Sequence, residues 1–327
     1  MRRDGPSGGT SSGAPDTIAT VELPGPWQHL RLAAHGARFH VALSDRPGST
    51  AQLVLFLHGF PEFWWAWRHQ LPALADAGYR AAAMDLRGYG GSDKTPRGYD
   101  PVNLADDVAG VIAALGAESA VVVGHGWGGM VAWSFAAIHP LRLDGLVAVS
   151  APHPLRLRRP DRTVGRQLTR AGHQLAFQAP WYPERALVAD HAALVGTLLR
   201  KWSADGSAFP DAVEEQHYRD AMRIWPASHC ALEYHRWLVR SFLRTDGRRF
   251  VGRVRNPVSA PVLQMHGSLD RSMLPGSARG SEDYVTGQYR WSEFDRAGHF
   301  PHEECPDEFT DALLSWLHEH APAGRAD

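Results

Sequence analysis

The chain has 327 residues, of which 44% are hydrophobic and 21% charged, a composition typical of a globular protein with a sizeable core and not of a disordered chain. Lys and Arg total 34 and Asp and Glu total 35, so the net charge of −1 gives no basis for electrostatic binding to nucleic acid or anionic lipid. With two cysteines, no apolar signal sequence and no run near the roughly 18 apolar residues of a membrane span, we expect a cytoplasmic protein that acts on a small molecule.

The first half of the chain alternates between strand and helix patterns. A Gly-, Ser- and Pro-rich start predicts a disordered tail over residues 1–20. Two strand-like runs around His35-Gly36 then predict a hairpin, and further apolar runs alternate with helical periodicities, which predicts a parallel sheet between helices. The predicted strands are Trp27–Ala33, Ala37–Leu43, Gln52–Leu57, Tyr79–Met84, Ala120–Val123 and Leu143–Val149, and the predicted helices begin near Arg68, at Pro101 and at Trp127.

The strand signal disappears near residue 152 and returns near residue 256. Between these points the segment is helical and rich in Arg and Trp, and two more strands, Pro261–Met265 and Tyr289–Phe294, precede a last amphipathic helix. An α/β sheet interrupted by about a hundred helical residues indicates a core with a lid. We expect a core over residues 21–152 and 256–322, and a helical lid over residues 153–255 inserted after the strand that ends near Ser150.

The segment of residues 121–129, Val-Val-Val-Gly-His-Gly-Trp-Gly-Gly, carries the most specific motif. A buried strand turns at once into a buried helix, with small residues on both sides of the turn. This pattern is typical of a nucleophile elbow, in which the central residue is held in a strained conformation above the sheet. Here the central residue is Gly126, so the position has no side chain that could attack a substrate.

With this elbow the chain resembles the α/β-hydrolase superfamily and, within it, the soluble epoxide hydrolases. Residues 58–65 (His-Gly-Phe-Pro-Glu-Phe-Trp-Trp) are similar to the family's oxyanion loop, and the elbow matches Gly-His-Asp-Trp-Gly-Gly in every position but the third. Residues 85–93, 266–270 and 298–300 match three further signatures. The resemblance covers nearly everything after the tail and implies an α/β-hydrolase fold, with a mostly parallel central sheet flanked by helices.

The resemblance also implies roles for individual residues. In the family a carboxylate displaces the oxirane oxygen, and a histidine then activates the water that cleaves the resulting ester. By position His299 is this base and Asp270 is the acid that orients it. The backbone N–H groups of Phe60 and Trp127 would form the oxyanion hole. Tyr234 matches one of two lid tyrosines that donate a hydrogen bond to the epoxide oxygen.

The second lid tyrosine is replaced in this chain. The matching position is His173. Nearby Tyr182 could supply the missing donor instead, and His173 could simply fill space in the lid. The other candidate pocket residues are Pro61, Trp64 and Phe177, although tryptophans of this loop could equally fill the core. No cofactor or metal ion is expected.

Other polar residues near the motifs have structural interpretations. His125 is expected to be a packed, hydrogen-bonded histidine and not a substitute nucleophile. Glu62 is the carboxylate nearest in sequence to the oxyanion loop, and we do not expect it to replace the missing nucleophile. Tyr234 has a structural alternative as an aromatic residue of the lid core.

Several functions therefore stay open. The first is an epoxide-hydrolase-like enzyme for a small apolar epoxide or ester-like substrate, in which His299 and Asp270 activate water directly. The second is a catalytically inactive homologue that binds a small ligand, and the third is a dehalogenase-like hydrolase, which Gly126 would impair equally. An Asp-to-Gly replacement, one base away in the codon, is a further explanation, and a homodimer is an alternative to a monomer.

Overall fold

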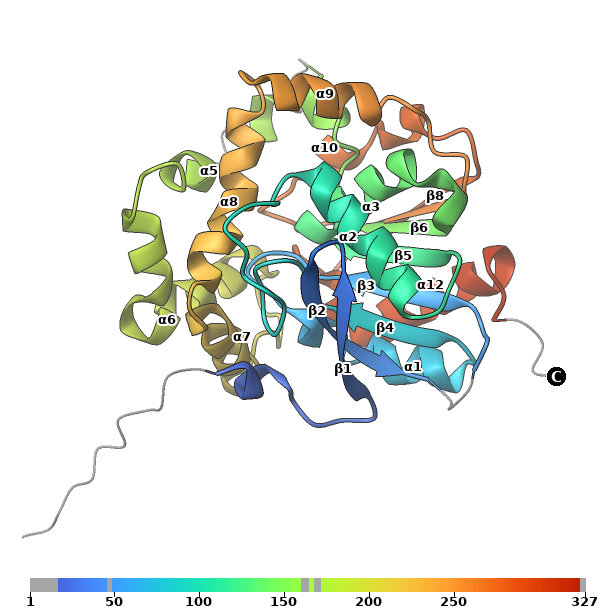
Figure 1. Cartoon of the computed structure of the whole chain (residues 1–327), viewed down its shortest axis with the longest axis horizontal. Coiled ribbons are helices and arrows are strands. Elements are labelled where there is room, and N and C mark those ends of the chain that lie inside the picture. Colours follow the sequence, from blue (N-terminus) through green and yellow to red (C-terminus); the bar gives the residue numbers. More distant parts are fainter. Residues whose placement is uncertain (1–16, 46–48, 160–164, 168–171, 324–327) are drawn as a thin grey trace, which may run out of the picture.

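An eight-stranded sheet forms the centre of the protein, a computed structural model that describes residues 17–45, 49–159, 165–167 and 172–323 (Figure 1). The strand order is β1-β2-β4-β3-β5-β6-β7-β8. The pairs β1–β2 and β2–β4 are antiparallel, and all other pairs are parallel. The strands are β1 Gln28–Ala34, β2 Ala37–Ser44, β3 Leu53–Leu57, β4 Arg80–Met84, β5 Ala120–His125, β6 Leu143–Val149, β7 Val262–Gly267 and β8 Tyr289–Phe294.

Every residue of the central strands β3, β5 and β7 is buried. This is expected of parallel strands covered on both faces, and it confirms the strands predicted from continuous apolar runs. Strand β5 continues two residues beyond the predicted end, because His125 still pairs with Val149 of β6. The strand therefore carries the chain directly into the elbow turn.

Helices flank the sheet, with α2 packed on α3 and α1 packed on α12. The predicted cap of α2 is confirmed, since the Asp100 carboxylate accepts hydrogen bonds from the N–H groups of the first turn. Among the described residues, no helix is both long and apolar enough to cross a bilayer. The helices of the core are α1 Gln70–Asp76, α2 Pro101–Ala114, α3 Trp127–Ile138, α10 Pro275–Ala278, α11 Pro301–Glu304 and α12 Pro306–His320, with the 3₁₀ turns η2 Trp64–Trp67, η3 Pro140–Arg142 and η5 Ser281–Tyr284.

The chain between β6 and β7 is helical and lies to one side of the sheet, at the left and top of Figure 1. Its helices α6, α7 and α8 pack on one another. Arg68 connects them to the core, because its guanidinium lies 2.7 Å from Glu303 of α11 and 2.5 Å from Glu214 of α7. We call this part the helical segment; it comprises η4 Arg156–Arg158, α5 Gly172–Ala176, α6 Tyr182–Trp202, α7 Ala212–Arg223, α8 Ala227–Arg240 and α9 Thr245–Arg253.

The predicted tail over residues 1–20 is described only at its C-terminal end. Residues 1–16 lie outside the described residues, but Ile18–Val21 form the 3₁₀ turn η1, which packs on α7. Val21 is fully buried, and its carbonyl accepts a hydrogen bond of 2.7 Å from the indole of Trp64. Val21 thus provides an apolar side chain that can be buried, which the polar sequence at the start of the chain does not.

The elbow brings α3 into contact with the ends of two strands. A Cβ on Gly128 would lie 2.3 Å from the carbonyl oxygen of Leu57, and one on Gly124 would lie 2.3 Å from that of Gly128. Backbone oxygens held in a sheet and a helix have little freedom to move away. Only glycine therefore permits α3 to begin so close to β3.

We predict that Gly128→Ala destabilises the protein by about 3 kcal/mol, because the added methyl overlaps backbone atoms. The control is Gly252→Ala at an exposed position of α9, where no atom lies within 4 Å of the added Cβ. This control should stabilise the protein by about 0.5–1 kcal/mol, because glycine is costly within a helix. Urea unfolding followed by circular dichroism measures both changes, and equal midpoints for the two variants would contradict the close approach.

Candidate active site

The turn between β5 and α3 places Gly126 at the N-terminal end of a helix. Its backbone angles are φ 51° and ψ −113°, a conformation that costs glycine little and that other residues rarely adopt. Its N–H donates to the Val149 carbonyl, and its own carbonyl accepts from the N–H of Met130, both at 3.0 Å. The strand-to-helix turn predicted from the sequence is present, with glycine as its central residue.

A side chain at this position would point to His299. A Cβ on Gly126 would lie 3.7 Å from Nε2 of His299 and 3.6 Å from Cα of Gly59, both ordinary contact distances. The imidazole is thus aligned with the elbow, although no side chain connects the two.

His299 is oriented by Asp270. Its Nδ1 lies 2.7 Å from one oxygen of the Asp270 carboxylate. The other carboxylate oxygen accepts hydrogen bonds of 2.8 Å from the N–H groups of Ser272 and Met273, at the start of the loop after β7. A carboxylate can only accept, so His299 donates from Nδ1, and its Nε2, when the ring is neutral, holds a lone pair on the side of Gly126.

Burial and hydrogen bonding set the charges of this pair. Burial alone would raise the pKa of Asp270, but the neighbouring rings of His299 and His266 outweigh this and hold the pKa of the carboxyl well below its usual range. Burial lowers the pKa of His299, and the Asp270 carboxylate offsets part of this effect. At neutral pH the pair is therefore a carboxylate beside a neutral imidazole, the state required of a general base.

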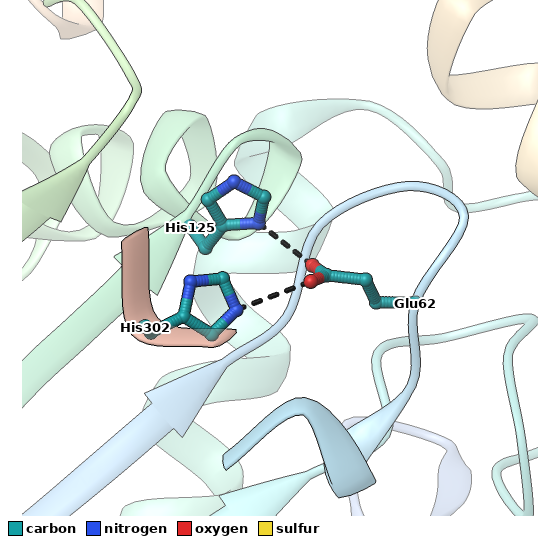
Figure 2. Close-up of side chains that lie close together, drawn as sticks. All are labelled: Glu62, His125 and His302. Carbon is teal, nitrogen blue, oxygen red and sulfur yellow. Dashed lines mark hydrogen bonds and ion pairs between the residues drawn. The ribbon is translucent and has the colours of Figure 1, made fainter. Parts of the chain in front are cut away.

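A second group of titratable side chains lies behind the elbow (Figure 2). One oxygen of the Glu62 carboxylate is 2.7 Å from Nδ1 of His125, and the other is 3.1 Å from Nε2 of His302. The backbone N–H of Gly59 also donates to Glu62, at 2.9 Å. All three side chains are fully buried. We call Glu62, His125 and His302 the buried network.

The network holds a charge pair. Both ring nitrogens of His125 face acceptors, since Nδ1 meets Glu62 and Nε2 lies 2.9 Å from the carbonyl oxygen of His299. Burial opposes a charged ring, but the Glu62 carboxylate outweighs it and raises the pKa of His125. Burial lowers the pKa of His302 to about 4, so this ring stays neutral and donates to Glu62. A buried carboxylate and a buried imidazolium thus neutralise one another.

The network connects the separate parts of the site. Glu62 holds the loop after β3 through Gly59, and His125 holds the backbone of His299. His and Glu are also ligands that zinc accepts, and the atoms concerned lie within 4.8 Å of one another. Those atoms are already joined by the hydrogen bonds just described, so the observed arrangement is that of a positioning network.

A cavity of about 80 Å³ opens above Gly126 and His299. Phe60 and Trp127, the expected oxyanion residues, both line it. Trp127 is the first residue of α3, and N–H groups of a first helical turn have no acceptor within the helix. The complete lining is Phe60, Gly126, Trp127, Met130, Ser150, Ala151, Pro152, Leu157, Gln174, Trp202, His235, Leu238, Ser272, Met273 and His299.

Three candidate pocket residues do not line this cavity. Trp64 is fully buried in the core, with its indole N–H bonded to Val21. Phe177 packs behind the wall, with its ring centroid 5.8 Å from that of Phe60, and Pro61 is buried without reaching the cavity. The side chain of His173 lies outside the described residues.

Tyr234 is also placed away from the cavity, and its neighbour takes the position. The Tyr234 hydroxyl donates to the Arg87 carbonyl at 2.7 Å, and the side chain is fully buried. His235 lines the cavity instead, where its Nε2 accepts from the Trp127 indole at 3.1 Å and its Nδ1 lies 2.8 Å from the side-chain oxygen of Gln174. A donor engaged with a backbone carbonyl is not available to a substrate, so this expectation for Tyr234 is corrected.

The sequence reasoning missed His235 and Gln174. Successive residues of a helix point about 100° apart, so either Tyr234 or His235 can face the cavity, and the motif alone favoured the wrong one. A usable signal was present, because Leu238 follows His235 at helical spacing and lines the cavity with it. Gln174 lies in α5, directly after His173, so the motif pointed to this helix but to the neighbouring residue.

Comparison with known proteins adds a family to this geometry. Residues 52–306 match the family model described as alpha/beta hydrolase fold. The chain is 32% identical over 316 residues to "Epoxide hydrolase A" of Mycobacterium tuberculosis, which covers 86% of this chain and 95% of that protein. It is 50% identical over 126 residues to "Epoxide hydrolase B" of the same species, a match spanning 38% of this chain and about a third (35%) of that protein. The crystal structure of "Epoxide Hydrolase A from Mycobacterium thermoresistibile" aligns with a TM-score of 0.74 at 28% identity, over 89% of this chain and 98% of that one.

We predict that Glu62→Gln destabilises the protein by about 3–5 kcal/mol at pH 7, because His125 then holds a buried charge without its counterion. Glu319→Gln, which removes an exposed partner of Arg290, is the control and should leave the stability unchanged. The pKa of Glu62 is held well below its usual value of 4.5, so its contribution is present above that pH. The difference between wild type and Glu62→Gln in urea unfolding should therefore shrink as the pH falls below 4.5, and a constant difference would refute the ion pair.

Proposed function

The chain belongs to the alpha/beta hydrolase fold family, in its epoxide-hydrolase branch, and from this premise we propose that it hydrolyses a small apolar epoxide or activated ester with water as the direct nucleophile. In this proposal His299 and Asp270 activate the water, and no covalent enzyme ester forms. The observation that carries the proposal is the intact His299–Asp270 pair facing a glycine.

The position of the water follows from the space beside Gly126. The Nε2 of His299 lies 3.7 Å from the point where a Cβ would be, and a cavity of about 80 Å³ is large enough for several water molecules. A water bonded to Nε2 there would stand near the position of the missing carboxylate. His299 would take its proton as the oxygen attacks, and Asp270 would stabilise the resulting imidazolium.

The N-terminal end of α3 supports the same reaction. The backbone N–H groups of Phe60 and Trp127 would stabilise an oxyanion formed from an ester, or the negative charge that develops on a leaving oxygen. The helix dipole of α3 favours negative charge at this end. The polar groups are thus at the base of the cavity, as addition of water to an apolar substrate requires.

The helical segment would act as the lid. Its residues Leu157, Trp202 and Leu238 line the cavity, and His235 and Gln174 are the polar groups that it contributes. Because the lid wall is mostly apolar, we propose an apolar substrate with one oxygen function.

A second candidate function is binding without turnover. Gly126 removes the covalent route, and the hydroxyl of Tyr234 is engaged with Arg87. In such a protein the same cavity would hold a small apolar ligand. An enzyme and a binding protein differ in whether His299 is needed for product formation.

We predict slow hydrolysis of a chromogenic epoxide or ester by the wild type and loss of this activity in His299→Ala. In Gly126→Asp the carboxylate would restore the covalent route, and the rate should rise by on the order of 10³- to 10⁶-fold, the range lost when such sites lose their nucleophile. Initial rates under identical conditions test both statements. Equal rates for the wild type and His299→Ala would exclude the water route and favour the binding protein.

The rate of the wild type should also follow the protonation of His299. Since the base must be neutral and burial lowers its pKa below the usual 6.5, the rate should be constant above pH 6.5. At lower pH, once the ring takes up a proton, it should fall by about tenfold per unit. A pH–rate profile from pH 4.5 to 8.5 checks this, and a rate that falls as the pH rises through 7 would contradict a histidine base.

A further inference from the structure

The open space at the N-terminal end of α3 has the features of a site for a small anion. We propose that the protein binds a small carboxylate of the size of acetate beside Gly126, with the carboxylate between the first turn of α3 and His299. This ligand goes beyond the proposed hydrolysis, and its binding does not require the protein to be active.

The first feature is the uncapped helix. Helix α3 spans Trp127–Ile138, and its N-cap residue is Gly126, which has no side chain to accept from the first-turn N–H groups. These N–H groups and the positive end of the helix dipole attract an anion. In most helices an Asp, Asn, Ser or Thr side chain at the N-cap supplies the acceptor.

The second feature is the ring nitrogen Nε2 of a buried histidine, which is aimed at the same point. His299 is 94% buried, since only 6% of its surface is exposed, and its Nδ1 is bonded to Asp270. Within the described part of the chain its Nε2 has no hydrogen-bond partner, and it lies 3.7 Å from the Cβ position of Gly126. This nitrogen faces the cavity, and once the ring carries a second proton it would donate to a carboxylate oxygen there.

The third feature is size. A methyl group at the Cβ position of Gly126 would meet only Gly59 and His299, at ordinary contact distances of 3.6 and 3.7 Å. Acetate is not bonded to Gly126, so its methyl group would lie farther out than a Cβ, at contact distance from the glycine Cα, within the cavity that Gly126 and His299 line. Beyond it the cavity of about 80 Å³ continues, so the site is not closed behind the ligand.

The nearby charges do not exclude an anion, because each is already paired. Asp270 lies on the far side of His299. Its carboxylate accepts hydrogen bonds from His299 and from two backbone N–H groups, and it also lies beside His266. Glu62 is neutralised by the imidazolium of His125. The groups that face His299 are thus Asp270, His125 and Glu62, and the carboxylate would form a new ion pair with protonated His299.

This coupling sets the pH dependence of binding. Because the bound anion favours the charged ring, binding takes up a proton and raises the pKa of His299. Acetate should therefore bind more tightly at pH 6 than at pH 8. A neutral molecule of the same shape, acetamide, lacks the charge and should not bind.

The test is thermal unfolding of the full chain in about 100 mM sodium acetate, compared with sodium chloride of equal ionic strength and with acetamide. For a dissociation constant on the order of 1 mM, Tm should rise by roughly 3–5 °C at pH 6 in acetate, and less at pH 8. Gly126→Asp supplies its own carboxylate and should show no acetate effect. An equal rise in wild type and Gly126→Asp, or no rise in the wild type, would overturn the proposal.

A second measurement uses the wild type alone, in case Gly126→Asp folds poorly. Histidine ring signals in NMR spectra should show one imidazole, assigned with His299→Gln, whose pKa rises saturably with acetate. If no histidine responds to acetate, the site does not exist. Neither readout involves a substrate, so failure of the hydrolysis and failure of carboxylate binding are separate outcomes.

Discussion

The buried carboxylate of Glu62 is the interaction on which the site depends. It accepts from Gly59 after β3, from His125 at the end of β5 and from His302 near the C-terminal helices. A carboxylate fully removed from water is costly unless it is paired and hydrogen-bonded, so these three parts of the chain must come together for the fold to be stable. Through His125 the same constraint reaches the backbone of His299. The loop, the elbow and the imidazole therefore have one common anchor.

The cavity next to this anchor has polar groups on two sides. On the core side, Asp270 fixes the ring of His299, and the N-terminal end of α3 faces the same space. On the opposite side, His235 is held by Trp127 and Gln174 in a neutral form, among the rings of Phe60 and Phe177. A ligand between them meets two imidazoles and mostly apolar walls, with Ser150, Gln174 and Ser272 as the other polar residues. Such an environment discriminates by shape along the walls and by polarity at the two ends.

The sheet was predictable because its buried strands are rich in apolar residues, and the elbow because Gly124 and Gly128 are required by backbone contacts that no larger residue permits. His299, Asp270, Phe60 and Trp127 follow from motifs whose position relative to the strands is fixed. In the structure Phe60, Trp127 and His299 line one cavity, and Asp270 is bonded to His299. The expectation that His125 is a packed, hydrogen-bonded histidine is confirmed.

Other features depend on contacts between residues that are far apart in sequence. Nothing local indicates that Glu62 pairs with His302, 240 positions later. The indole of Trp64 is bonded to the carbonyl of Val21, the first residue after the predicted tail, 43 positions earlier. The exchange of Tyr234 for His235 is a rotation about the axis of α8, set by the Arg87 carbonyl that receives the tyrosine hydroxyl. Patterns of residue type contain no information on such partners.

The backbone angles of Gly126 have a consequence for the history of the protein. Any other residue at φ 51° stores roughly 1–3 kcal/mol of strain, which glycine releases. An ancestor that exchanged aspartate for glycine here would have gained folding stability in the same step that ended covalent catalysis. The reverse exchange is equally short in the genetic code but energetically uphill. Stability therefore favours keeping glycine at this turn, and a return to aspartate would require selection for a particular reaction.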